Sequence, residues 1–415
     1  MERTFVTFLL VLGICRASLL LEDTVDVDLK YRLPPGVIPT AYKLHLTPDL
    51  ETFTFEGEVE ITLVALITNN ILTLNLKDLT VHDINFMDLN TTKTLWNYYI
   101  TDPKHQILSI TTKPHFEKDH HYSLKIKYNG IFNDNMRGLY VSRVVRKGGD
   151  IAYIITTNFK PTGARLVFPC WDEPAYKAKF NITLTHAMTL QAISNMDVLK
   201  KEEEDGMMIT SFKETPPMST YLLAFVISDN QFKEDKVGNF TYRVWAEESM
   251  IEGTDYALKM GRKLLEQLNS YMNISYQTFM PDKIDQVLVK DLHPADAIEN
   301  WGLMIYRYLE VMHIAIRMQR VLLFIDLSWW VRSWTPLNSN FYFREDTLLY
   351  DDVFSVTRRK IDILAIIAQE ITHQWFGNLV SPKWWKYLWL SEGLSTYFQY
   401  FLAREVNAIL NSLLI

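Results

Sequence analysis

Between about residues 31 and 230 the sequence repeats short segments in which apolar and polar residues alternate. Examples, in order along the chain, are KLHLTPDL, EGEVEITLVAL, ILTLNLKDLTV, HYSLKIKYNG and FNITLTHA. Turn-forming pairs such as Asn129-Gly130 separate them. Alternation with period two is typical of a strand with one buried face, and many such strands divided by turns predict an antiparallel β-sandwich-like domain. We assign this domain to residues 30–234.

A different periodicity begins near Phe240. Between Gly253 and Asn273 the apolar residues recur at helical spacing, which predicts an amphipathic helix. The stretch KIDQVLV then reads as a strand, and two more helices are expected, over Thr357–Phe376 and about Leu388–Glu405. We therefore predict a two-domain α+β chain, with residues 235–415 forming a mixed second domain. The apolar positions of the first helix are Ala257, Met260, Leu264, Leu265 and Leu268.

The composition and charge of the chain are those of a globular protein and argue against nucleic-acid binding. The chain has 415 residues, of which 48% are hydrophobic and 22% charged, as in ordinary globular proteins large enough for two domains. The net charge is -7 and the sequence has no long basic run. Because phosphate binding requires clustered Lys and Arg, these features argue against a nucleic-acid partner.

The N-terminus, MERTFVTFLLVLGICRAS, has a basic start, an apolar core and small residues before a polar continuation. This pattern predicts a signal peptide over residues 1–17, and the alternative is a buried N-terminal strand. The chain would then be a glycoprotein that is secreted or lies on the extracellular face of the plasma membrane. Four N-x-S/T sequons agree with that location, at Asn90, Asn181, Asn239 and Asn273.

The strongest chemical signal lies in IAQEITHQWFGNL, residues 367–379. Gln369 and His373 are four positions apart, so on a helix their side chains share one face. In the H-E-x-x-H motif two histidines at this spacing bind Zn²⁺, and the glutamate, here Glu370, faces the metal-bound water. In this chain the first histidine position holds Gln369.

Glu392 lies on the next predicted helix, with 18 residues between it and His373. A catalytic zinc site has three protein ligands and one open position. A carboxylate on a neighbouring helix is suited to be the third ligand.

Three segments resemble the aminopeptidase N-type zinc metallopeptidases, in that family's order along the chain. ITHQWFGNLVSPKWWKYLWLSEGLSTYFQY resembles its zinc-helix region, DAIENWGLMIYR resembles its G-A-M-E-N loop, and TTNFKPTGARLVFPCWDEPAYKAKFNITL resembles the stretch that joins its β domain to the active site. The resemblance implies a thermolysin-like zinc-peptidase domain after the β domain, truncated in this chain. It also implies hydrolysis of the N-terminal residue from peptides that have a free N-terminus.

The resemblance implies a role for each matching residue. His373 and Glu392 match zinc ligands, and Glu370 matches the catalytic general base. Glu299 matches the carboxylate that binds the substrate's α-ammonium, and Asn158 falls where the family often has a glutamine that helps to bind it. Two neighbours of Glu299 in the same loop complete the predicted site for the substrate N-terminus, Ala297 and Asn300.

Several features depart from the family pattern. Gln369 replaces a ligand, and an amide is a poorer zinc donor than imidazole, so zinc is expected to be bound weakly or not at all. Asp296 replaces the glycine of the loop, where a side chain could strain the backbone or compete with Glu299. Residues 308–344 interrupt a segment that reads MIYREDTLLYDD if Arg307 is joined to Glu345. We interpret them as an insertion, for which translated intron sequence is one explanation.

The family's oxyanion-stabilising tyrosine and its helical C-terminal domain would follow Ile415. Family members are often membrane-anchored, and the sequence shows no lipid-anchor signal or stop-transfer helix, so membrane association is expected only through an anchor beyond that residue. Two functions remain open: a zinc aminopeptidase impaired by Gln369, Asp296 and truncation, or an inactive homologue or fragment that at most binds peptide N-termini through Glu299.

Overall fold

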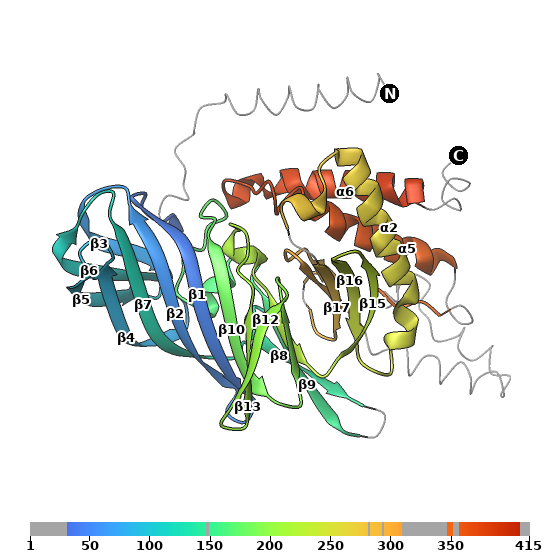
Figure 1. The fold of residues 1–415 in the computed structure, drawn as a ribbon, viewed down its shortest axis with the longest axis horizontal. Helices are drawn as coiled ribbons and strands as arrows, with labels where there is room; N and C mark the ends of the chain where they lie inside the picture. The colour runs from blue at the N-terminus through green and yellow to red at the C-terminus, as the bar shows by residue number, and fades with distance from the viewer. Residues whose placement is uncertain are drawn as a thin grey trace, which may run out of the picture. The chain divides into compact units, whose positions relative to one another are not determined.

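A computed structural model describes residues 31–146, 149–280, 283–292, 294–308, 347–351 and 357–406. The chain divides into two compact units, Met1–Pro34 and Pro35–Ile415, and the described strands and α-helices belong to the second (Figure 1). The predicted signal peptide and nearly all of the predicted insertion lie outside the described residues. No helix of the described residues is long and apolar enough to cross a bilayer.

The first part of this unit is a ten-stranded sheet in the order β12-β13-β10-β1-β2-β7-β4-β5-β6-β3. Its pairs are antiparallel except for β1 and β10, which are parallel. The strands are β1 (Val37–Asp49), β2 (Thr54–Ala65), β3 (Asn69–Asn75), β4 (Leu79–Asp88), β5 (Lys93–Asp102), β6 (Ile107–Phe116), β7 (His121–Ile131), β10 (Lys179–Ala187), β12 (Val198–Glu204) and β13 (Met207–Phe212).

Alternation in the sequence becomes alternation of burial in these strands. In β2, for example, the buried residues alternate with residues that are at least partly accessible; the buried ones are Phe55, Gly57, Val59, Ile61, Leu63 and Ala65. A four-stranded antiparallel sheet in the order β11-β14-β9-β8 continues this β region. Its strands are β8 (Gly138–Val145), β9 (Ile151–Asn158), β11 (Gln191–Ser194) and β14 (Phe225–Ser228).

A mixed five-stranded sheet begins the second part, in the order β15-β16-β17-β19-β18. The pairs β16–β17 and β17–β19 are parallel, and the outer pairs are antiparallel. The predicted α+β class, with an N-terminal β region before a mixed second part, is thereby confirmed. The strands are β15 (Gln231–Val237), β16 (Phe240–Ala246), β17 (Lys283–Val289), β18 (Ala297–Ile298) and β19 (Leu303–Arg307). The boundary after residue 234 stays a prediction.

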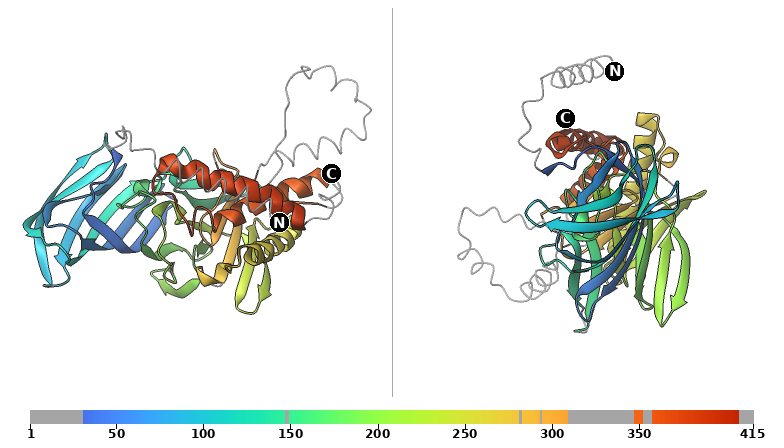
Figure 2. Two further views of the ribbon diagram at one scale, coloured as in Figure 1. Left: turned by 90° about the horizontal axis from the view of Figure 1, so that it is seen from above. Right: turned by 90° about the vertical axis from the view of Figure 1, so that its left-hand side faces the viewer.

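Three α-helices accompany this sheet among the described residues: α2 (Asp255–Met272), α5 (Thr357–His373) and α6 (Leu388–Val406). Helices α5 and α6 lie side by side, and α2 packs against both (Figure 2). The expected helix over Thr357–Phe376 ends three residues early, because after His373 the backbone tightens to i,i+3 bonds before Gly377. Short 3-10 turns cover Ala164–Leu166, Thr220–Leu222, Ile251–Thr254, Tyr276–Thr278 and Trp385–Tyr387.

Two residues on either side of the predicted insertion are in contact. The Thr347 hydroxyl donates a hydrogen bond of 2.7 Å to the Arg307 carbonyl oxygen, although the two residues are 40 positions apart in the sequence.

Helix α2 buries every apolar position expected from the sequence, and Gly261 with them. A Cβ atom at Gly261 would lie 2.2 Å from the Tyr242 hydroxyl and 2.6 Å from its ring carbon Cζ. Tyr242 on β16 is fully buried, so it has little room to move. We expect Gly261→Ala to lower the free energy of unfolding by about 1–3 kcal/mol through overpacking, although alanine favours a helix.

Denaturant unfolding followed by circular dichroism measures this effect. Ser270→Ala, at an exposed position of the same helix, serves as the control and should be neutral or slightly stabilising. Equal stabilisation by both substitutions would show that the close approach of α2 to β16 is not as described.

Candidate active site

The C-terminal end of α5 is fixed by the β region. Gly377, at φ +134°, ends the helix, and its carbonyl oxygen accepts a 2.7 Å hydrogen bond from the buried Tyr221 hydroxyl. The Lys177 ammonium donates to the carbonyl oxygens of Asn378 and Leu379, at 3.1 and 2.9 Å. A cation suits this end of a helix, where the backbone dipole is negative. These contacts set the position of His373, on the last turn of α5.

The loop that carries Glu299 is attached to the same helix. The side-chain amides of Gln374 and Asn378 donate to the Glu299 carbonyl oxygen, at 3.2 and 2.8 Å. Gln374 also donates to the Glu370 carbonyl oxygen at 3.0 Å. Both amides are completely buried, so they hold the Glu299 backbone against α5 with little freedom.

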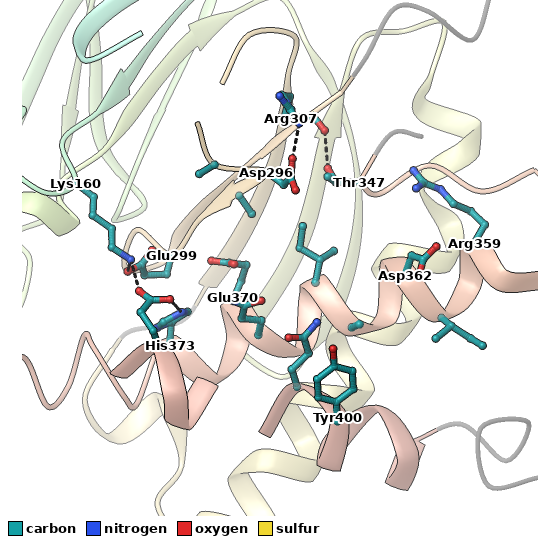
Figure 3. A pocket seen from close by; sticks show the side chains of 18 of the residues that line it. Lys160, Asp296, Glu299, Arg307, Thr347, Arg359, Asp362, Glu370, His373 and Tyr400 are labelled. Atoms are coloured by element: carbon teal, nitrogen blue, oxygen red, sulfur yellow. Dashed lines mark hydrogen bonds and ion pairs between the residues drawn. The ribbon is translucent and has the colours of Figure 1, made fainter. Parts of the chain in front are cut away.

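Helix α5, helix α6 and this loop line one pocket of about 1050 Å³. Gln369, Glu370 and His373 reach it from α5, and Glu392 from α6. Figure 3 shows Glu370 and His373 on the same side of α5, with Glu299 beside them. The structure thus brings together the residues that the sequence predicted from three separate segments.

His373 and Glu392 face each other across this pocket. The His373 Nε2 lies 3.6 Å from the Glu392 Oε2, and the His373 Nδ1 is 3.1 Å from the Phe376 carbonyl oxygen. A carbonyl oxygen at Nδ1 favours the tautomer that leaves Nε2 free to meet a ligand. Glu299 joins them, since its ligand atom and theirs all lie within 4.8 Å of one another.

Lys160 also reaches into this cluster. It lies just after β9, and its Nζ is 2.6 Å from the Glu299 Oε1 and 2.7 Å from the Glu392 Oε1. The side chain enters from the β region, on the other side of the acids from α5 (Figure 3). One ammonium therefore bridges two carboxylates of the predicted site.

The charges of the site shift one another's pKa values. Burial alone would raise the pKa of Glu299 and of Glu392, but Lys160 and His373 outweigh it, and the pKa of Glu392 falls to about 2. Burial would lower the pKa of Lys160, but the two carboxylates raise it. Glu370 behaves differently: burial raises its pKa to about 8 despite the nearby imidazole.

The remaining predicted residues lie in different surroundings, and neither Asn300 nor Asn158 is among the described residues that line the pocket. Ala297, on β18, lines the pocket, and the Asp296 carboxylate there accepts a hydrogen bond from Arg307. Asn300 is buried, and its amide lies 3.4 Å from the Tyr221 carbonyl oxygen. Asn158, at the end of β9, donates to the Met136 carbonyl oxygen at 2.9 Å. The substrate-binding roles of these residues stay predictions.

Comparison with known proteins assigns the chain. Residues 38–222 match the peptidase M1 N-terminal domain, and residues 338–413 match the peptidase family M1 domain, which contains α5 and α6. The chain belongs to the M1 peptidase family, of the aminopeptidase N type. The family resemblance inferred from the motifs is thereby confirmed.

Curated relatives of the M1 family are similar over most of this chain. Aminopeptidase M1 of Arabidopsis thaliana is 32% identical over 372 residues, which are 89% of this chain and 38% of the relative. Aminopeptidase 2, mitochondrial, of Saccharomyces cerevisiae is 33% identical over 400 residues, 94% of this chain and 36% of the relative. Aminopeptidase N of Rattus norvegicus is 32% identical over 389 residues, which are 89% of this chain and 36% of the relative. The chain thus spans little more than a third of the length of these relatives.

M1 aminopeptidases are zinc metalloenzymes, and Glu299, His373 and Glu392 form a possible metal-binding triad in this chain. The side chains as they stand nevertheless do not fit a tightly bound catalytic zinc. Among the described residues lining the pocket, His373 has the only imidazole. Gln369 has an amide at the position where the H-E-x-x-H motif has its first histidine. Two of the three triad residues, the carboxylates, already bind the Lys160 ammonium.

Sequence reasoning missed three residues of this M1 site. Gln374 and Asn378 position Glu299 and lie one and five residues after His373, so their place next to the motif was a usable signal. Lys160 had a weaker signal: it lies two residues after Asn158, inside a stretch that resembles the family. Its contact with Glu392 joins residues 232 positions apart, which only the fold reveals.

Proposed function

We propose that this chain is an M1 aminopeptidase homologue in which hydrolysis is impaired because the metal half of the site is incomplete. The reaction of the intact site would be removal of the N-terminal residue from peptides. Glu299 would bind the substrate's α-ammonium, and Glu370 would take a proton from the attacking water. A bound zinc would supply polarisation of the peptide carbonyl.

The observation that carries the impairment is the donor set around position 369. A catalytic zinc takes three protein ligands. In this chain Gln369, one helical turn before His373 on the same helix face, has an amide instead of an imidazole. Altering even a residue that only orients a ligand costs about 10–100-fold in metal affinity, so loss of a ligand costs at least as much. The alternative function is binding of peptide N-termini without hydrolysis, favoured by the buried Glu299 carboxylate at the pocket.

The purified chain tests this proposal directly. After dialysis against a chelator and return to a zinc buffer, we expect well below one zinc per chain by elemental analysis. We also expect hydrolysis of alanyl and leucyl reporter amides no faster than in the Glu370→Gln variant. One retained zinc per chain, together with turnover that Glu370→Gln abolishes, would identify an active aminopeptidase and contradict the impairment.

We further propose that the chain is a secreted or cell-surface glycoprotein. The N-terminal pattern supports this, as do Asn90, Asn239 and Asn273, three sequon asparagines that the structure places on the surface. One relative, of Rattus norvegicus, is named thyrotropin-releasing hormone-degrading ectoenzyme. N-terminal sequencing of the product from a secreting cell should find cleavage near Ala17, and an intact Met1 would contradict it.

We also propose that residues 308–344 are an insertion into the M1 domain. The hydrogen bond between Thr347 and Arg307 supports this, because it brings together residues that lie on either side of the segment. Transcripts that encode Arg307 directly before Glu345 would support the idea, and abundant transcripts with the segment would count against it.

A further inference from the structure

Lys160 comes from neither α5 nor α6 nor the Glu299 loop, and its ammonium reaches the acids of the site from the β region. It bridges Glu299 and Glu392 with hydrogen bonds of 2.6 and 2.7 Å. The Lys160 side chain is only 20% exposed and that of Glu299 only 5%. A charge-assisted hydrogen bond in such a place is strong, because water competes for it poorly.

The chemistry of this ammonium matches that of the proposed ligand. A peptide N-terminus is also a primary ammonium with three N–H donors, and Glu299 is the carboxylate proposed to receive it. Lys160 offers Glu299 the same group from within the chain. It also occupies an oxygen of Glu392, the carboxylate proposed to serve as a metal ligand.

A second cation could not share these oxygens at low cost. Two positive charges a few ångströms apart in a partly buried site repel each other strongly, whether the second cation is an ammonium or a metal ion. A ligand cation would therefore have to displace the lysine from its two carboxylates.

We propose that Lys160 is the resident cation of this pocket, an autoinhibitory contact whose ammonium takes the place of a peptide's α-ammonium on Glu299 and opposes zinc at Glu392. This role rests on the proposed function, since it takes Glu299 as the receptor of peptide N-termini. It adds a second cause of impairment that is independent of Gln369.

Lysine variants separate this role from a merely structural ion pair. Lys160→Met and Lys160→Gln remove the charge, whereas Lys160→Arg keeps a cation. The matched control is Lys179→Met, which removes a lysine from an exposed pair with Glu214. Titration calorimetry would measure the Kd of alanyl-alanine amide, of its N-acetylated form and of zinc.

We expect Lys160→Met and Lys160→Gln to bind the free-amine peptide and zinc at least about tenfold more tightly than the native chain. Lys160→Arg and Lys179→Met should bind as the native chain does, and the N-acetylated peptide should gain nothing in any variant. Folded Lys160→Met and Lys160→Gln proteins with native affinities would overturn the proposal.

If both Lys160→Met and Lys160→Gln fail to fold, a measurement on the native chain tests the role of Lys160 instead. Acylation of lysines, read by mass spectrometry, should proceed faster at Lys160 when excess alanyl-alanine amide is present, because displacement exposes its amine. The N-acetylated peptide should have no effect, and Lys179 serves as the internal reference. An unchanged rate at Lys160 under saturating peptide would overturn the proposal.

Different experimental results would refute the role of Lys160 and the proposed function. Tight zinc and rapid turnover in the native chain would refute the impairment. Equal affinities in the native chain and the neutral Lys160 variants would refute the resident cation alone.

Discussion

Replacing Gln369 with histidine should tighten zinc binding by at least about 10–100-fold. The new imidazole would lie one helical turn from His373 on the face that lines the pocket, so that two nitrogen donors and Glu392 could surround one ion. Competition with a chromophoric chelator measures the affinity. The gain should add to that of Lys160→Met, since one substitution supplies a donor and the other removes a charge.

Gln399→His is the matched control for this substitution. Gln399 lines the same pocket but lies on α6 about two turns beyond Glu392, so its imidazole would be too far from His373 to share an ion. Zinc affinity should stay within about threefold of that of the native chain. An equal gain from both variants would mean that any added imidazole suffices and that position 369 has no special role.

Replacing Lys283 with methionine should lower the free energy of unfolding by about 3–5 kcal/mol. The Lys283 ammonium is buried on β17 and pairs with the Asp285 carboxylate. It also donates to the carbonyl oxygens of Ser194, at 2.6 Å, and Gly302, at 3.2 Å. Methionine fills a similar volume but removes one donor from the Asp285 carboxylate, which keeps Arg243 and Trp245, and one from each of the two carbonyl oxygens.

Denaturant unfolding measures the change, with Lys127→Met as its control. Lys127 is 57% exposed and lies 3.8 Å from Glu58, so its loss should alter stability by no more than about 0.5 kcal/mol. A Lys283→Met protein as stable as the control would show that the buried cluster contributes nothing net. Because Gly302 follows the Glu299 loop, zinc and peptide affinity should weaken in parallel.

Local patterns sufficed to predict most of the β region and α2. Strands such as β2 and β10 have one buried face, so burial alternates along them and the alternation is visible in the sequence. The apolar face of α2 could also be predicted from the sequence, because that helix packs one face and exposes the other.

Strand β17 was correctly predicted as a strand, but its burial could not be read from the pattern. KIDQVLV has polar residues at its first, third and fourth positions, and yet all seven residues are buried. A parallel strand in the middle of a sheet has both faces covered, so its polar side chains find partners inside the protein. Arg243, Trp245 and Lys283 supply them for Asp285. The first two come from another strand and cannot be seen in the heptapeptide.

The candidate site was predictable to the extent that helix geometry and family motifs define it. The spacing of Glu370 and His373 fixes one helix face, and the resemblance supplied Glu299 and Glu392. Lys160 could not be predicted in the same way, because a lysine after a strand is usually solvated and its partners are remote in sequence.

Crystals of the native chain soaked in zinc, with anomalous scattering measured on both sides of the zinc absorption edge, would show whether the pocket binds the metal. We expect no zinc peak between His373 and Glu392, with the Lys160 ammonium hydrogen-bonded to Glu299 and Glu392. A full-occupancy peak bonded to His373, Glu392 and the Gln369 amide, with Lys160 turned away from the acids, would contradict it.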